Sequence, residues 1–487
     1  MKKKLNLRFR SFAVIFLIVV NSICVSAQKL SAPNGLEAYL KSQMQKLKIP
    51  GLQIAIVKNA KIVMQGSYGI ANLEDSVPVT NKTVFSINSA TKSFTGVAIM
   101  QLVEVGKVDL DAPISRYLDG LPTEWQPVKV RQLLAHTSGI PDIIDRDAPS
   151  LLDDNFDASL ARILTLPMEF KTGDRFSYNQ TNYLLIGKII DKLSGQPFIE
   201  FIKERQFKTV GMTQADWGDF YDVVPNKAKS YHYNRFGDNK FTNNYEAFSK
   251  PLRTGAGINT TAHEIAQWMI ALQSGKLLQK SSLPILWKSE VSNITNLPVG
   301  YAMGFPTIVR SEHPAVAGIG GGRSAFFIYP DDDMAIVILT NRIGASPESF
   351  IDEVAGFYIP DMKASTGFGL PPAIKILRAE LLKVGFEKAV DVMKALNIKY
   401  SKYQLSEGEL NQWGYVLLRQ EKPKESLEIF KLNVVLYPES GNVYDSLAEA
   451  YEVNGDKSSA IKNYKRSLEL DPKNGNAVVQ LKRLESK

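Results

Sequence analysis

The stretch Val84-Phe-Ser-Ile-Asn-Ser-Ala-Thr-Lys92 joins an extended segment to the start of a helix. It ends in Ser89-x-x-Lys92, and a spacing of three residues places the lysine one turn further along the same helix face. The lysine amine can then reach the serine hydroxyl and accept its proton, which makes Ser89 a candidate nucleophile. Free backbone N–H groups at the helix start offer half of an oxyanion hole.

This S-x-x-K spacing is weak evidence when it stands alone. It occurs three times in the chain, and the other two serines, Ser26 and Ser459, lie in a predicted signal peptide and a predicted repeat helix. Ser89 also has a structural alternative, because a serine at a helix N-terminus is a common N-cap. Motifs elsewhere in the chain must therefore decide.

Other familiar catalytic arrangements are missing from the sequence, which contains no G-x-S-x-G elbow, no P-loop and no H-E-x-x-H motif. None of the four histidines lies at metal-ligand spacing from another histidine or a cysteine: His136, His232, His263 and His313. We therefore expect no metal, no cofactor and no ordinary Ser-His-Asp triad.

Strand patterns flank the Ser89 segment at a distance on both sides. Residues 51–57 and 62–65 predict a hairpin, and the same pattern returns at 324–329 and 334–340 around a Pro-Asp turn. Helical patterns precede and separate these hairpins at residues 36–47, 91–105, 130–135, 183–194 and 262–274. We expect an α+β fold in which one antiparallel sheet is closed by both ends of the domain, with a helical insertion beside it.

Two further motifs follow Ser89 in the order Val130-Arg-Gln-Leu-Leu-Ala-His-Thr-Ser-Gly-Ile-Pro141 and Phe176-Ser-Tyr-Asn-Gln-Thr-Asn-Tyr-Leu-Leu-Ile-Gly187. With Ser89-x-x-Lys92 in front, this order resembles the class C β-lactamase family of penicillin-recognising serine hydrolases, which includes D-amino-acid-specific peptidases and esterases. The resemblance covers about residues 36–358 and implies a β-lactamase/transpeptidase-like α/β sandwich beside a helical subdomain. We interpret His136 and the Thr-Ser-Gly after it as a structural motif that ends a helix.

The resemblance implies a role for each matching residue. Ser89 matches the family nucleophile, Lys92 its partner, and Tyr178 the tyrosine that relays the proton to and from the serine and the leaving group. The family's Tyr-x-Asn is here Tyr178-Asn179-Gln180. Gln180 has the same amide one methylene further out, so we expect it to orient a substrate carbonyl with shifted geometry.

The family's third motif, a Lys-Thr-Gly or His-x-Gly on the strand beside the nucleophile, is altered. The corresponding stretch runs from Gly318 to Phe327 and puts Ile319 where a cation or imidazole is expected. We expect the backbone N–H of Gly322 to be the second oxyanion donor. On an extended strand, Arg323 would point to the same face as Ile319 but lie about 13 Å further along. It would then restore some positive field at the site without making the contact of the family's basic side chain. We therefore expect uncharged acyl substrates rather than β-lactams.

The C-terminal part of the chain differs in composition. A Gly/Pro-bearing linker at 362–372 separates the predicted hydrolase domain, 28–361, from a helical tail at 373–487. Residues repeat with a period of 34 in this tail: Trp413/Leu447, Gly414/Ala448, Leu417/Tyr451, Ser426/Ala460, Phe430/Tyr464 and Pro438/Pro472. This pattern resembles tetratricopeptide repeats, with clear copies at about 407–440 and 441–474. Because about three repeats are needed to bury a continuous core, we expect the tail to lean on the hydrolase domain.

The net charge of +8 comes mostly from the N-terminus. Residues 1–27 carry five of the 58 basic residues and no acid, followed by a short apolar run at 12–20 and Val25-Ser-Ala27. This pattern predicts a signal peptide cleaved after Ala27 and a mature chain of charge +3 with no cysteine and no transmembrane anchor. We expect no nucleic-acid partner. A lipid-modified Cys24 is the alternative, although Ile23 is a poor fit where a small residue is usual.

These patterns leave two hypotheses. The first is an exported, periplasmic or secreted serine hydrolase that cleaves a small acyl substrate (an ester, peptide or β-lactam) through an acyl-serine intermediate, with esterase or D-amino-acid peptidase activity favoured over true β-lactamase activity. The alternative is a weak or inactive penicillin-binding-like protein, in which Ile319 and Gln180 mark decay and the repeat tail binds a protein or cell-wall partner. In both, pocket shape depends on residues 213–251, either a substrate-covering flap or a long surface excursion.

Overall fold

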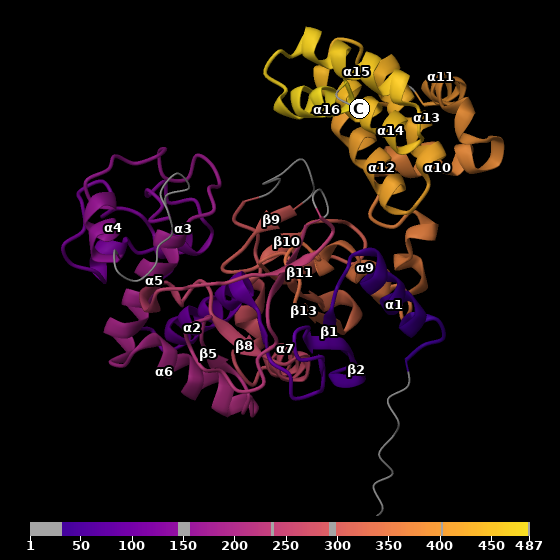
Figure 1. Ribbon diagram of the computed structural model, residues 1–487. Helices are drawn as coiled ribbons and strands as arrows, with labels where there is room; N and C mark the ends of the chain where they lie inside the picture. Colours follow the sequence, from indigo (N-terminus) through magenta and orange to yellow (C-terminus); the bar gives the residue numbers. More distant parts are fainter. Residues whose placement is uncertain (1–31, 145–155, 235–237, 292–298, 401–402, 486–487) are drawn as a thin grey trace, which may run out of the picture.

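The computed structural model of the chain describes residues 32–144, 156–234, 238–291, 299–400 and 403–485 (Figure 1). The predicted signal peptide lies outside these residues. Within the described ranges, no helix is both long enough and apolar enough to cross a membrane.

An eight-stranded antiparallel sheet forms the centre of the N-terminal domain, in the order β3-β2-β1-β13-β12-β11-β10-β9. Its strands are β1 (Gly51–Lys58), β2 (Lys61–Asn72), β3 (Val77–Pro78), β9 (Val299–Tyr301), β10 (Pro306–Ile308), β11 (Ala315–Gly320), β12 (Ser324–Tyr329) and β13 (Met334–Thr340). β1 pairs with β13, with Leu52 opposite Thr340 and Lys58 opposite Met334. Both predicted hairpins and the closure of the sheet by the two ends of the domain are therefore confirmed.

Helices cover both faces of this sheet. In β1, Ala55 and Val57 pack into the core formed with α2 (Thr91–Glu104) and α7 (Ala262–Ser274). The alternate residues Ile54 and Ile56 pack with α1 (Leu36–Lys46) and α9 (Ile351–Ala355) on the opposite face. Because successive side chains of a strand point to opposite faces, a strand covered on both sides is apolar at every position. This accounts for the unbroken apolar runs of β1 and β13.

The helical subdomain lies beside the sheet, next to α2 (Figure 1). It contains α3 (Val130–Leu134), α4 (Phe156–Ile163), α5 (Gln180–Ser194) and α6 (Phe198–Ile202), and α8 (Leu283–Leu286) also packs near α2. A small sheet of β4 (Phe85–Ser86), β8 (Ile258–Thr260) and β5 (Asp216–Trp217) leads into the Ser89 segment, and β6 (Tyr231–Tyr233) pairs with β7 (Phe241–Asn243). The start of α2 is thereby held between the large sheet and α5.

The tail consists of antiparallel helices: α10 (Pro372–Val384), α11 (Ala389–Lys399), α12 (Glu407–Arg419), α13 (Pro423–Leu436), α14 (Gly441–Val453), α15 (Lys457–Leu470) and α16 (Gly475–Glu485). α12 and α14 begin 34 residues apart, as do α13 and α15. A Cβ atom at Gly414 would lie 2.5 Å from the Phe430 ring, which explains why a small residue is needed where α12 and α13 cross. The helix pairs thus have the expected period, and their assignment to tetratricopeptide repeats stays a prediction.

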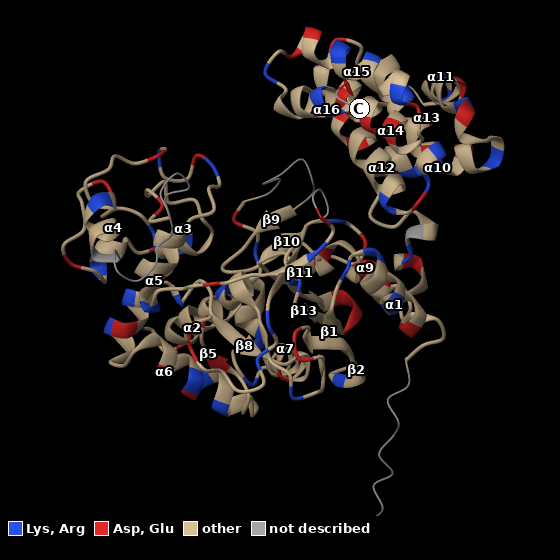
Figure 2. Cartoon of the chain, in the orientation of Figure 1, with Lys and Arg blue, Asp and Glu red and all other residues tan. Residues whose placement is uncertain are grey.

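The tail and the N-terminal domain have separate apolar cores among the residues described. They meet through polar contacts: Lys46 pairs with Glu421 at 2.9 Å and Lys375 with Glu312 at 2.6 Å. Exposed pairs of this kind contribute only about 0–1 kcal/mol each. Acidic and basic residues are interspersed along the tail helices (Figure 2), as is typical of solvated helix faces.

Candidate active site

Ser89 and Lys92 meet at the start of α2. Ser89 lies in the single 3-10 turn Asn88–Ala90 and remains partly accessible, whereas the Lys92 side chain is completely buried. Lys92 Nζ lies 3.5 Å from Ser89 Oγ, a distance typical of a nucleophile and its base before substrate binds. No side chain caps either the 3-10 turn or α2, so the structure does not use Ser89 as an N-cap.

The remaining partners of Lys92 are neutral oxygen atoms. Its Nζ donates to Gln180 Oε1 at 3.0 Å and to the Gly255 carbonyl at 2.9 Å. No carboxylate forms an ion pair with Lys92 in the described part of the chain. Proton transfer between Ser89 and the Lys92 amine would therefore disturb no buried ion pair.

Tyr178 covers Lys92 on the solvent side. Lys92 Nζ lies 4.7 Å from the centroid of the Tyr178 ring, and Tyr178 is 36% exposed. Behind it, the buried ring of His136 lies 4.4 Å away, and the Asn179 N–H donates to His136 Nδ1 at 3.0 Å. Burial, and then the charge of Lys92, holds the pKa of His136 well below its ordinary value, so the imidazole is neutral. His136 therefore supports the tyrosine by packing, which agrees with its structural interpretation.

The Tyr178-Asn179-Gln180 motif is divided between two tasks. Asn179 caps α5, because its side chain accepts from the Asn182 N–H at 3.0 Å and donates to the Ile140 carbonyl at 2.6 Å. Gln180 is the first residue of α5, and its longer side chain reaches Lys92. The extra methylene of the glutamine therefore spans the distance to the site while the asparagine fixes the helix start.

β11 runs against the Ser89 segment and has a free edge there. β10 pairs with β11 only at Ala315 and Val316, so among the described residues the rest of that edge, to Gly320, has no neighbouring strand. Gly320 lies so close to the segment that a Cβ atom there would be 1.9 Å from the Ile87 carbonyl oxygen. An unpaired strand edge beside a nucleophile is a place where a substrate backbone or carbonyl can bind.

Residues 36–355 match the family described as Beta-lactamase, which is more than half of the chain. The chain belongs to this family. Penicillin-binding protein PbpX of Bacillus subtilis (strain 168) is 30% identical over 288 residues, which are 59% of this chain and 69% of PbpX. Protein flp of Staphylococcus aureus (strain N315) is 30% identical over 187 residues, 37% of this chain and only 38% of flp. The D-amino acid amidase from Ochrobactrum anthropi SV3 shares the fold, with a TM-score of 0.58, 21% identity, and coverage of 67% of this chain and 99% of the amidase.

The third family motif lies on a hairpin, which corrects the single extended strand expected over residues 318–327. β11 ends at Gly320, and Gly321 and Gly322, both at φ +58°, form a turn closed by the Arg323 N–H and the Gly320 carbonyl at 3.1 Å. The Gly322 carbonyl accepts from the Ser346 N–H at 2.7 Å, and Gly322 makes no hydrogen bond with Ser89. The three consecutive glycines, Gly320 to Gly322, are the sequence signal for this turn. Two successive residues with a left-handed backbone are disfavoured for most residue types other than glycine.

The side chain of Ile319 also faces a different core from the one expected. Ala315, Ala317 and Ile319 pack with α1 and α9, whereas Val316 packs on the α2 face. Strand alternation therefore turns Gly318 and Gly320, rather than Ile319, toward α2. No cation replaces the family's basic side chain on this face, since its positions carry valine and glycine.

Arg323 does not supply positive field to Lys92 and Ser89 as expected. Its guanidinium is buried and forms an ion pair with the Glu246 carboxylate. It also donates to Asn88 Oδ1 at 2.8 Å and to Ser230 Oγ. Its charge is balanced, and its hydrogen bond to the Ser89 segment goes to Asn88 rather than to Ser89 or Lys92. The error arose because the alternation of side chains along a strand was extended from Ile319 through the glycine turn to Arg323.

Gly255 belongs to the site and was missed in the sequence. Its carbonyl accepts from Lys92, and a Cβ atom there would lie 2.8 Å from Gln180 Oε1 and 3.0 Å from Lys92 Nζ. Only glycine leaves room for this three-way contact. The Gly255-Ala-Gly257 run before β8 was the available signal.

Proposed function

We propose that the protein is a serine acyl hydrolase that cleaves an uncharged ester or a D-amino-acid amide through an acyl-Ser89 intermediate. The observation that carries this proposal is the buried Lys92 amine, 3.5 Å from Ser89 Oγ and held by neutral oxygen atoms beneath Tyr178. Serine and lysine in this arrangement form a nucleophile and its base.

In the first step, Ser89 Oγ attacks the carbonyl carbon, and its proton passes to Lys92, directly or by way of Tyr178. The tetrahedral intermediate then collapses, the bond to the leaving alcohol or amine breaks, and the proton moves to that leaving group. In the second step water attacks the acyl-serine carbonyl carbon and gives a proton to the same pair. The second tetrahedral intermediate collapses with breakage of the acyl–Ser89 Oγ bond, that proton returns to Ser89 Oγ, and the acid is released. Tyr178 is exposed enough to contact both the leaving group and the incoming water.

The oxyanion donors in this proposal are the N–H of Ser89 and an N–H on the free edge of β11. The Arg323 N–H to Gly320 carbonyl bond turns the hydrogen-bonding groups of Gly320 toward β12. Because these groups alternate along an antiparallel strand, the N–H of Ile319 points to the unpaired edge. Ile319 therefore replaces Gly322 as our candidate donor, with a backbone group that does not depend on its side chain.

The proposed substrate class follows from the missing cation. A carboxylate beside the scissile bond, as in penicillins, needs a basic partner, and the α2 face of β11 has none at Val316, Gly318 or Gly320. Uncharged acyl groups need only the backbone donors. The fold shared with a D-amino acid amidase adds that class of amide to the substrates worth testing.

A substrate panel tests the proposal. p-Nitrophenyl butyrate, D-phenylalanine amide, a D-Ala-D-Ala peptide and a cephalosporin are compared on the wild type and on Ser89→Ala. We expect turnover of the ester or the amide to exceed that of the cephalosporin and to be lost in Ser89→Ala. Equal turnover by the two proteins on every substrate would instead favour the inactive, partner-binding alternative.

The location and the tail complete the proposal. We propose export on the strength of the N-terminal charge and apolar pattern, which intact mass of the secreted protein would test by loss of residues 1–27. The repeat tail is proposed as a protein-binding unit. Deleting residues 370–487, which keeps Met362 and Phe368 in the core of the N-terminal domain, should leave ester turnover within about twofold, because the two apolar cores are separate.

A further inference from the structure

His313 lies where the linker of the tail meets the N-terminal domain. It belongs to the loop between β10 and β11, has a left-handed backbone with φ of +48°, and its side chain is mostly buried. Its Nδ1 lies 2.8 and 2.9 Å from the two carboxylate oxygen atoms of Asp332, in the turn between β12 and β13. Its Nε2 lies 3.0 Å from Asp361 Oδ2, at the start of the linker. One imidazole thus joins three segments that are separate in sequence.

Both ring nitrogen atoms of His313 face carboxylates. A carboxylate oxygen can only accept a hydrogen bond, so each of these contacts needs a proton on the ring nitrogen. The imidazolium carries both protons, whereas a neutral imidazole carries one. The two contacts are therefore complete only while His313 is protonated.

The two carboxylates differ in their exposure to water. The Asp332 side chain is 13% exposed, and its backbone carbonyl also accepts from Lys58 Nζ at 2.8 Å. The Asp361 side chain is 71% exposed, so water can replace His313 as its partner. When His313 loses a proton, we therefore expect the contact with Asp361 to open first.

The linker follows the same loop beyond Asp361. Arg310 Cζ lies 4.4 Å from the centroid of the Phe368 ring, which is 5.6 Å from the His313 ring. Arg310 is itself held by two hydrogen bonds to the Asp352 carboxylate of α9, at 2.8 and 3.0 Å. Its Nε donates to the His313 carbonyl at 2.9 Å. These contacts do not use the protons of the imidazole, so they form the constant part of the linker's attachment.

The charges around His313 favour its protonated form. Burial alone would lower the pKa of His313, but hydrogen bonds with Asp361 and Asp332, together with their charges, raise it above the ordinary value. The hydrogen bond that His313 donates lowers the pKa of Asp361. Likewise, the hydrogen bond from Lys375 of α10 lowers the pKa of Glu312, so both carboxylates stay ionised near neutral pH. His313 is therefore the residue here that changes its charge in this range.

We propose that His313 is a pH-responsive latch, which in its protonated form ties the linker at Asp361 to the N-terminal domain and in its neutral form lets that stretch loosen. Met362 stays buried in the apolar core, so the linker loosens locally and does not detach. The tail and the N-terminal domain have separate cores, so the linker is part of what holds the tail in place. This device does not depend on the proposed hydrolase activity.

The direction of the pH response follows from the raised pKa of His313. The contact contributes its full stability below the ordinary histidine pKa of about 6.5, and it is lost as the pH rises through the higher value of the folded protein. The linker should therefore be held more firmly in mildly acidic than in mildly basic solution.

Hydrogen–deuterium exchange of the full chain at about pH 6 and about pH 8.5 tests this proposal, with each rate divided by the intrinsic exchange rate at the same pH. Residues 360–375 of the wild type should exchange about two- to fivefold faster at the higher pH, since a single pair with one exposed partner contributes little. His313→Asn keeps a residue type that tolerates the left-handed backbone and removes the imidazole. Its linker should exchange at the faster rate at both pH values. The matched control His263→Asn, at an exposed histidine of α7 outside this cluster, should keep the wild-type response.

A histidine titration by nuclear magnetic resonance gives an independent readout on the wild type, with His313→Asn used to assign the signal. The pKa of His313 should lie above its ordinary value and should fall in Asp361→Asn, because one of the two carboxylate partners is then lost. Equal wild-type linker exchange at the two pH values, or an unchanged pH response in His313→Asn, would overturn the proposal. So would a pKa of His313 at or below its ordinary value.

Discussion

Two buried cations contact neighbouring residues of the Ser89 segment, Lys92 at Ser89 and Arg323 at Asn88, and the protein holds them differently. Lys92 is bonded to three neutral oxygen atoms, whereas Arg323 is paired with the carboxylate of Glu246. Removing the proton from a cation paired with a buried carboxylate leaves an unpaired anion, which is costly. The partners of Lys92 impose no such cost. The contrast supports our proposal that Lys92 transfers the proton and that Arg323 has a structural charge.

Asn88 separates these environments. It has a left-handed backbone, with φ of +46°, and its side chain is bonded to Arg323, Glu246 and Ser86. Ser89 follows directly and faces Lys92. The side-chain hydrogen bonds of Asn88 thus hold this backbone turn. Ser89 Oγ is therefore not needed to hold it.

Lys92→Met gives the largest expected effect on turnover. The methionine keeps the length and packing of the side chain but removes the base, so kcat/KM for the preferred ester should fall by about 10⁴-fold. Steady-state kinetics measure this change, with circular dichroism to verify the fold. Turnover within tenfold of the wild type would break the contrast, because proton transfer would then not depend on Lys92.

Tyr178→Phe separates the hydroxyl from the ring. The phenylalanine can keep the packing on His136 and over Lys92, so the thermal midpoint should be unchanged. Loss of the proton relay should lower kcat by about 10²-fold. A drop in stability without a drop in kcat would make Tyr178 a packing residue only.

Arg323→Met should act mainly on stability. It leaves the partly buried Glu246 carboxylate without a cationic partner, which should cost about 1–3 kcal/mol of unfolding free energy in urea titration. The double variant Arg323→Met/Glu246→Met removes both charges and should recover most of that loss. Turnover of either folded variant should fall less than that of Lys92→Met, and a larger fall would show that Arg323 acts on the chemistry.

The sequence predicted the parts of this structure that depend on local pattern. The hairpin at 324–340 followed from two largely apolar β-rich runs around a Pro-Asp turn, and the meeting of Ser89 with Lys92 followed from their three-residue spacing. Gln180 lies beside Lys92 because it directly follows the residue that caps α5, and its role toward a substrate stays a prediction.

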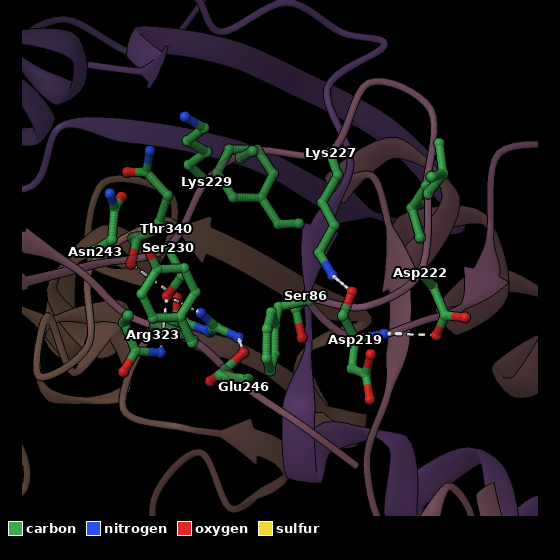
Figure 3. Close-up of a pocket in the computed structure, with 18 residues that line it drawn as sticks. Ser86, Asp219, Asp222, Lys227, Lys229, Ser230, Asn243, Glu246, Arg323 and Thr340 are labelled. Atoms are coloured by element: carbon green, nitrogen blue, oxygen red, sulfur yellow. Dashed lines mark hydrogen bonds and ion pairs between the residues drawn. The ribbon is translucent and has the colours of Figure 1, made fainter. Parts of the chain in front are cut away.

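The errors arose where distant segments decide the geometry. The sequence prediction extended strand alternation through Gly320, Gly321 and Gly322. In the structure a left-handed turn there reverses the chain and takes Arg323 away from the site. A cavity of about 350 Å³ between residues 213–251 and the ends of β12 and β13 (Figure 3) was not foreseen, because those residues have no readable periodicity and become a wall only when they meet these strands. Neither contact leaves a signal in local sequence.

Covalent labelling of Ser89 tests the central claim most directly. Wild type, Ser89→Ala and Lys92→Met are treated with a fluorophosphonate and analysed by intact mass and peptide mapping. We predict one adduct on the wild type, located at Ser89, none on Ser89→Ala, and much slower labelling of Lys92→Met. No adduct on the wild type, or an equal adduct on Ser89→Ala, would contradict the account.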